Sequence, residues 1–193
     1  MRIIKTISIL IVLAILIGLL FQVSYPSKIE HIIYPLEYRK SIKAASVKYS
    51  IDPYLICAII YVESKFNPSS ESSKGAVGLM QVMPDTGKWI AKTTGQQFDV
   101  NDLDDPEKNI DMGCWYFNYL RSKYQDERLV LAAYNSGYKN VDTWLRTANH
   151  DTVDDLITRI PYSETRLFVQ RVQKARSMYK KIYPKEFDAI GLQ

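Results

Sequence analysis

The feature that most constrains this chain is a helix that carries a carboxyl group on its apolar face. Asp52 and Pro53 predict where the helix begins, because an aspartate caps free amide groups and a proline fits the first helical turn. With about 3.6 residues per turn, Ile56, Ile59 and Glu63 fall on one stripe. An Asn-Pro pair then ends the helix. The chain must pack this stripe against a core, and Glu63 lies along it.

The expected surroundings of Glu63 disfavour its charged form. Apolar neighbours and the carbonyl end of the helix dipole both oppose a negative charge, so we expect the pKa of Glu63 to be raised. A glutamic acid that stays protonated near neutral pH is what a general acid requires. The alternative is a helix-end glutamate whose side chain bends back into water. The segments that follow favour the general acid.

Four short motifs follow one another along the chain. They are Glu63-Ser64, Gly75-Ala76-Val77-Gly78-Leu79-Met80-Gln81 with Met83-Pro84 and Thr86 after it, Ala133-Tyr134-Asn135, and Ile160-Pro161-Tyr162-Ser163-Glu164-Thr165. In this order and spacing they resemble the SLT-type lytic transglycosylases, whose lysozyme-like domain cleaves bacterial peptidoglycan. The resemblance covers about residues 45 to 183 and is far more specific than a lone Glu-Ser pair. It implies a mostly helical, lysozyme-like single domain.

The resemblance also implies roles for particular residues. Glu63 matches the catalytic acid of the family, and six positions match residues near the sugar chain: Ser72, Gln81, Met83, Tyr134, Asn135 and Glu164. For three of them an ordinary structural role is also adequate: loop polarity for Ser72, core packing for Met83 and a helix-start acid for Glu164. No metal ion and no organic cofactor is implied.

The reaction implied by the resemblance cuts the β-1,4 bond between N-acetylmuramic acid and N-acetylglucosamine and leaves a 1,6-anhydromuramoyl end. Glu63 would act first as acid and then as base. Hydrolases of the two-carboxylate plan need a partner carboxyl group, and no motif of this sequence supplies an obvious one. Two alternatives stay open: a goose-type lysozyme, in which water attacks, and a catalytically silent scaffold that binds the cell wall.

The amino terminus resembles a membrane-targeting segment. Arg2 and Lys5 precede an almost wholly apolar run from Ile7 to Phe21, which is at the short end for a membrane span. No small-residue cleavage signal and no lipoprotein cysteine follows the run. We therefore expect an uncleaved anchor within residues 1–25, with a signal sequence removed after export as the alternative.

The expected organisation follows from this segment. Basic residues before an apolar span stay in the cytoplasm, so the remainder of a single-pass protein lies outside it. Residues 26–36, which include two prolines, are predicted to be a connector, and residues 37–193 the lysozyme-like domain. The expected partners are peptidoglycan glycan strands and, through the amino terminus, the membrane. No protein partner is indicated.

Charge and cysteine content exclude other classes of function. The formal net charge of +4 is too small for the basic surface of a nucleic-acid-binding protein. Cys57 and Cys114 lie in predicted helices and lack a zinc-site pattern, so we expect two buried thiols, although an exported protein could also form a disulfide.

The acidic run from Asp99 to Asp105 resembles a calcium loop but lacks its glycine and distal glutamate. A helix cap at Asp104 or Asp105 explains it better.

Other helices are predicted from caps and apolar spacing. They run from about Glu37 to the turn before Asp52, from Pro84 to Gly95, from Pro106 to before Gln125, from Glu127 to Asn135, around Val141–Leu145, and from a cap at Ser163 through Ile182. No pair of alternating strands is evident.

Overall fold

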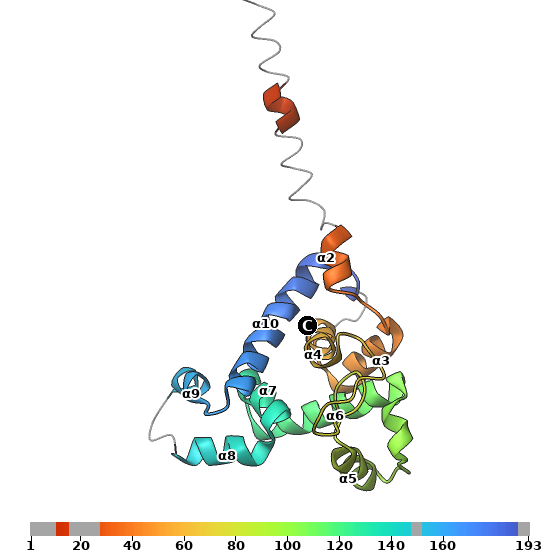
Figure 1. Cartoon of the computed structure of the whole chain (residues 1–193), viewed down its shortest axis with the longest axis vertical. Coiled ribbons are helices and arrows are strands. Elements are labelled where there is room, and N and C mark those ends of the chain that lie inside the picture. Colours follow the sequence, from red (N-terminus) through yellow and green to blue (C-terminus); the bar gives the residue numbers. More distant parts are fainter. Residues whose placement is uncertain (1–10, 16–27, 148–151, 189–193) are drawn as a thin grey trace, which may run out of the picture. The chain divides into compact units, whose positions relative to one another are not determined.

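The computed structural model describes residues 11–15, 28–147 and 152–188, and Figure 1 shows their helices. The chain divides into two compact units, residues 1–35 and residues 36–193.

In the first unit, residues 11–15 are helical and helix α2 spans Lys28–Ile33. Helix α2 was not predicted and lies within residues 26–36, for which only a connector was expected. None of the described helices is both long enough and apolar enough to cross a membrane. Most of the expected anchor in residues 1–25 lies outside the described residues.

The second unit is built from helices. They are α3 (Arg39–Tyr49), α4 (Pro53–Ser64), α5 (Pro84–Thr94), the 3-10 helix η1 (Val100–Leu103), α6 (Pro106–Lys123), α7 (Glu127–Ser136), α8 (Tyr138–Thr147), α9 (Val153–Arg159) and α10 (Ser163–Ile182). The described residues form no β-strand; they contain only isolated β-bridges, such as that between Val77 and Val82. The prediction of a mostly helical domain is confirmed.

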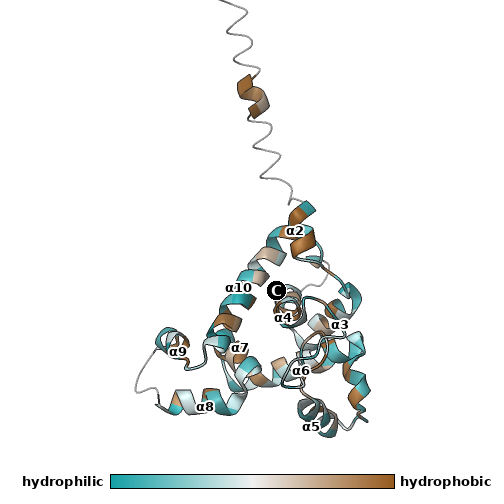
Figure 2. Ribbon diagram, viewed as in Figure 1, coloured by the Kyte–Doolittle hydropathy of each residue, from teal (hydrophilic) through white to brown (hydrophobic). Residues whose placement is uncertain are grey.

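Helix α4 is the centre of this unit and packs chiefly on α10 and α3. As predicted, the Asp52 side chain accepts a hydrogen bond from the Tyr54 backbone N–H at 2.9 Å, and Pro53 is the first residue of the helix. Ile56, Ile59 and Ile60 of α4 are fully buried, and the helix is coloured mainly brown in Figure 2. Lys65, in the left-handed conformation, ends it.

Most of the other predicted helix ends are confirmed. Gly95 ends α5 in the left-handed conformation, and Gly137 ends α7. Asp105 caps α6 by accepting from the backbone N–H of Lys108 at 2.9 Å. Cys57 and Cys114 are both buried and both free thiols, as predicted.

The carboxy-terminal part differs from the prediction at two places. Ser163 is the first residue of α10 and does not cap it; the cap position is Tyr162, without a side-chain hydrogen bond. Helix α9 was not expected at all. It begins at a capping box in which Thr152 Oγ1 accepts from the backbone N–H of Asp155, and the Asp155 carboxylate accepts from Thr152.

Candidate functional site

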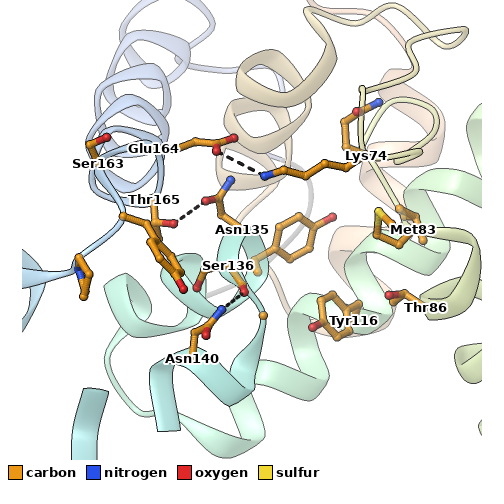
Figure 3. A pocket seen from close by; sticks show the side chains of 16 residues that line it. Lys74, Met83, Thr86, Tyr116, Asn135, Ser136, Asn140, Ser163, Glu164 and Thr165 are labelled. Carbon is orange, nitrogen blue, oxygen red and sulfur yellow. Dashed lines mark hydrogen bonds and ion pairs between the residues drawn. The ribbon is translucent and has the colours of Figure 1, made fainter. Parts of the chain in front are cut away.

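A cavity of about 730 Å³ opens among the start of α5, the middle of α6, the end of α7 and the start of α10. Five of the predicted site residues line it: Gln81, Met83, Tyr134, Asn135 and Glu164. Figure 3 shows Met83 on one side of the cavity and Glu164 on the other, with Asn135 between them. Glu63 and Ser72 are not among the lining residues. The fold thus brings together residues that lie up to 83 positions apart in the sequence.

Glu63 is the penultimate residue of α4 and is half-buried. Its carboxyl group makes no hydrogen bond or ion pair within the described part of the chain. Burial raises the pKa of Glu63 to about 8, and the negative charge of Glu164 adds to this effect. The charge of Glu63 in turn helps to raise the pKa of Tyr134, after the larger effect of burial. Glu63 is therefore coupled electrostatically to two residues of the cavity wall.

The loop that carries Gly75–Gln81 is held to the helices by three side chains. Ser64, directly after Glu63, donates to the carbonyl of Leu79 at 2.8 Å. The Tyr134 hydroxyl donates to the carbonyl of Met80 at 2.8 Å. Asn109, fully buried on α6, accepts from the Met80 backbone N–H at 2.8 Å. These bonds explain why the Glu-Ser, glycine-rich and Ala-Tyr-Asn motifs occur together, because each supports the same loop.

Gly78 has no substitute in this loop. Its φ of +80° is a conformation that side chains disfavour. A Cβ atom there would also lie 2.2 Å from Asn109 Nδ2 and 2.5 Å from the Leu103 carbonyl oxygen. Asn109 Nδ2 already donates to the carbonyls of Val77 and Leu103, both at 2.9 Å. The glycine lets the loop approach α6 closely.

Gln81 and Ser72 have well-defined local partners. The Gln81 side-chain amide donates to the carbonyls of Ser70 and Gly78, both at 2.9 Å, which leaves its Oε1 atom available as an acceptor. Ser72 Oγ accepts from the Ala76 backbone N–H at 3.0 Å and closes the loop. The structure thus gives Ser72 a role in shaping the loop.

The opposite wall joins α7 to α10. Asn135 Oδ1 accepts a hydrogen bond from Thr165 Oγ1 at 2.8 Å, so the Asn135 amide nitrogen is left free of described partners. Glu164 forms an ion pair with Lys74 at 3.5 Å, and both side chains are about three-quarters exposed. Figure 3 shows both interactions as dashed lines. The Ala-Tyr-Asn motif and the last motif therefore form one wall.

Sequence reasoning missed several residues of the cavity. Lys74, Tyr116 and Asn140 line it, and Asn140 donates to the Ser136 carbonyl at 2.6 Å at the start of α8. Their sequence positions carry no periodic or motif signal, since Tyr116 reaches the cavity only through the packing of α6. A metal site has no support within residues 11–15, 28–147 and 152–188, where no three acidic, histidine or cysteine side chains gather.

The site combines a carboxyl group that stays protonated near neutral pH with a cavity that offers uncharged donors and acceptors. A protonated carboxyl can give a proton to a leaving oxygen. Amide groups and partly exposed aromatic rings suit a polar, uncharged ring system such as a sugar. The arrangement therefore fits general acid catalysis on a carbohydrate.

Comparison with known proteins finds a matching family model and similar chains. The model of the Transglycosylase SLT domain matches residues 40–157. The membrane-bound lytic murein transglycosylase C of Photorhabdus laumondii is 34% identical over 166 residues, which cover 74% of this chain and 46% of that protein. The soluble lytic murein transglycosylase of Escherichia coli is 34% identical over 155 residues, 76% of this chain and 23% of that protein.

A solved structure is similar as well. The crystal structure of the 70-kDa soluble lytic transglycosylase of Escherichia coli matches with a TM-score of 0.74 and 32% identity, over 82% of this chain and 26% of that chain. The chain spans less than half the length of these relatives. The family model covers more than half of the chain itself. The resemblance predicted from the motifs is thereby confirmed, and the chain belongs to the Transglycosylase SLT domain family.

Proposed function

We propose that this protein is a peptidoglycan lytic transglycosylase. It cleaves the β-1,4 bond between N-acetylmuramic acid and N-acetylglucosamine and leaves a 1,6-anhydromuramoyl end. Membership of the family and relatives named as lytic murein transglycosylases support this assignment. The observation that carries it is the carboxyl group of Glu63, whose pKa is raised to about 8 and which interacts electrostatically with Glu164 and Tyr134 of the cavity wall.

Glu63 serves in two steps. As an acid it donates its proton to the glycosidic oxygen while the bond from that oxygen to C1 of the muramoyl residue breaks. As a carboxylate it then takes the proton of the C6 hydroxyl while O6 forms the new bond to C1. The proton lost in the first step is regained in the second, so no water is consumed and the enzyme is regenerated.

The cavity residues hold the sugar chain. The free amide nitrogen of Asn135 can donate to an N-acetyl carbonyl, and Gln81 Oε1 can accept from an N-acetyl N–H or a hydroxyl. Met83, 39% exposed, offers an apolar contact to a ring face. The Tyr134 hydroxyl proton is already given to Met80, so its oxygen is an acceptor. We assign Glu164 to the rim of the site, and Ser72 to the loop that shapes it.

A second candidate is hydrolysis by a goose-type lysozyme mechanism. The charge of Glu164 acts on Glu63, and a second carboxyl group near the acid is what activation of a water molecule requires. The ion pair between Glu164 and Lys74 and their high exposure favour a rim contact instead. The products separate the two reactions, because hydrolysis leaves a reducing muramoyl end.

The test is digestion of purified peptidoglycan with the full chain, followed by mass analysis of the fragments. We expect muramoyl ends about 18 mass units lighter than those of a hydrolytic digest, the mass of one water. Reducing ends alone would establish the lysozyme reaction. If the peptidoglycan stays intact, and a Glu63→Gln variant replaces the wild-type protein in the cell without loss of function, the protein would be a binding scaffold.

We also propose where the protein acts. Residues 1–25 direct it to the membrane as an uncleaved anchor, residues 26–36 connect, and residues 37–193 form the catalytic domain outside the cytoplasm, where peptidoglycan lies. The basic and apolar pattern of the amino terminus supports this. Membrane fractionation and protease protection of intact spheroplasts are the tests. Recovery of a shortened, soluble chain would replace the anchor with a cleaved signal.

A further inference from the structure

Four aromatic side chains of α5 and α6 form one continuous cluster, which we call the aromatic platform: Trp89, Trp115, Tyr116 and Tyr119. The Trp115 and Tyr119 rings are parallel within 2°, with centroids 5.9 Å apart. Tyr116 and Tyr119 are parallel within 16°. Trp89 meets Tyr119 edge-on at 4.8 Å and Trp115 edge-on at 5.2 Å. Three rings thus share nearly one orientation, and the fourth braces them.

The aromatic platform lies at the surface. Trp89 is 37% exposed, and the other three rings are half-buried. No hydrogen bond within the described chain uses the indole N–H groups or the hydroxyls of these four residues. Aromatic residues with polar tips normally find a partner or face water. A surface that combines flat apolar rings with unused donors is suited to an amphipathic ligand.

The aromatic platform continues directly from the cavity. Tyr116 lines the cavity and contacts Tyr134 at a ring distance of 5.6 Å. Thr86 also lines the cavity, and Trp89 follows it by three residues on α5, which places both on one face of that helix. Figure 3 shows Tyr116 and Thr86 on the same side of the cavity. A chain that leaves the cavity on this side therefore meets the aromatic platform.

We propose that the aromatic platform binds sugar rings of the glycan strand that extend beyond the cavity. This inference rests on the proposed function, because it takes the ligand of the cavity to be that strand. The sugar rings present C–H faces that pack on aromatic rings, while their hydroxyl and N-acetyl groups pair with the free N–H and O–H groups. The aromatic platform thereby makes affinity depend on strand length.

The test measures binding to the full chain carrying Glu63→Gln, so that no strand is cut. The probes are a peptide-free tetrasaccharide, as the short ligand, and peptide-free glycan strands several times longer. Adding Trp89→Ala should raise the Kd for long strands about fivefold and leave the Kd for the tetrasaccharide unchanged. Lys88→Ala, an exposed position beside Trp89 on α5, is the matched control and should change neither value.

A second variant separates ring contact from damage to the fold. Trp89→Phe keeps an aromatic ring and should bind long strands within about twofold of the parent. Equal long-strand affinity with and without Trp89→Ala would overturn the inference, as would weakening of both probes alike. Capture of a protein by the aromatic platform, with unchanged strand binding, would also overturn it. Because binding is measured without turnover, these outcomes are independent of whether the wild-type chain releases anhydro ends.

Discussion

Helix α4 carries one acidic side chain at each end, Asp52 before its first residue and Glu63 at its penultimate one. Asp52 accepts hydrogen bonds from Arg176 Nε at 2.8 Å, and Lys180 lies 2.9 Å away. Burial alone would raise the pKa of Asp52, but the bonds from Lys180 and Arg176 outweigh it and lower that pKa. Glu63 is also buried in part, has no such partner, and its pKa rises to about 8.

The comparison shows that partners, more than burial, decide the charge of a carboxyl group in this protein. At one end of α4 the cations of α10 keep the charge and join the two helices. At the other end the fold buries Glu63 with a second acid near it and no cation partner among the described residues, which raises its pKa at a cost in stability. A buried acid without a cation is a feature of catalytic sites. The same helix thus separates an acid that stabilises the fold from the acid that we propose is catalytic.

The largest expected effect of breaking this comparison is on catalysis by Glu63. Glu63→Gln removes the proton donor and should lower kcat on peptidoglycan about a thousandfold, while circular dichroism stays unchanged. Asp52→Asn is the matched variant on the same helix and should keep kcat per folded molecule within about tenfold. Equal losses of kcat in the two variants would contradict the proposed difference between the two ends of α4.

The next effect is on stability at Asp52. Asp52→Asn leaves Arg176 and Lys180 without their carboxylate partner and should lower the free energy of unfolding by about 2 kcal/mol at pH 7, as measured in urea. Because folding lowers the pKa of Asp52, this contribution is present above its ordinary value of 3.8 and is lost as the pH falls through the lower folded value. A difference between variant and wild type that persists at the lowest pH would contradict this account.

The contribution of Glu63 to the free energy of unfolding should change with pH in the opposite direction. Its pKa is 4.5 in the unfolded chain and about 8 in the folded one, so between these values the unfolded state loses its proton first and wild-type stability falls as pH rises. Glu63→Gln has no such loss and should be more stable than wild type by about 3 kcal/mol at pH 7. The two chains should become equally stable near pH 4. A stability gap that does not grow between pH 5 and pH 8 would show that Glu63 is solvated.

The smallest expected effect concerns Glu164. Its negative charge raises the pKa of Glu63 after the larger effect of burial, so Glu164→Gln should lower that pKa and move the alkaline limb of the kcat profile to lower pH. A structural loss alone would lower kcat at every pH without moving the limb. An unmoved limb would mean that Glu164 acts only on substrate binding, which the KM would report.

Local chemistry allowed much of the fold to be predicted. Asp52-Pro53, Asp105-Pro106, Gly95 and Gly137 act within one helical turn, so their effects can be read from neighbouring residues. Helix α9 was missed because its capping box follows a polar stretch and its apolar face is short. The first residue of α10 was mistaken for its cap because serine is common at both positions.

The site was predicted only in part, because its geometry depends on long-range packing. Glu63 and the motif residues were found from a helix stripe and a resemblance. Asn109, which supports the glycine-rich loop, belongs to no motif and is recognised only when α6 packs on that loop. Tyr116 reaches the cavity in the same way. No local pattern contains such contacts.

The most direct test of the central claim is a carbon-13 NMR titration of the side-chain carboxyl groups in the wild-type chain. Glu63 should titrate at a pKa of about 8, while Asp52 in the same spectrum should titrate below 3.8. A Glu63 titration near the ordinary value of 4.5 would contradict the account, because the side chain would then be charged at neutral pH and have no proton to donate.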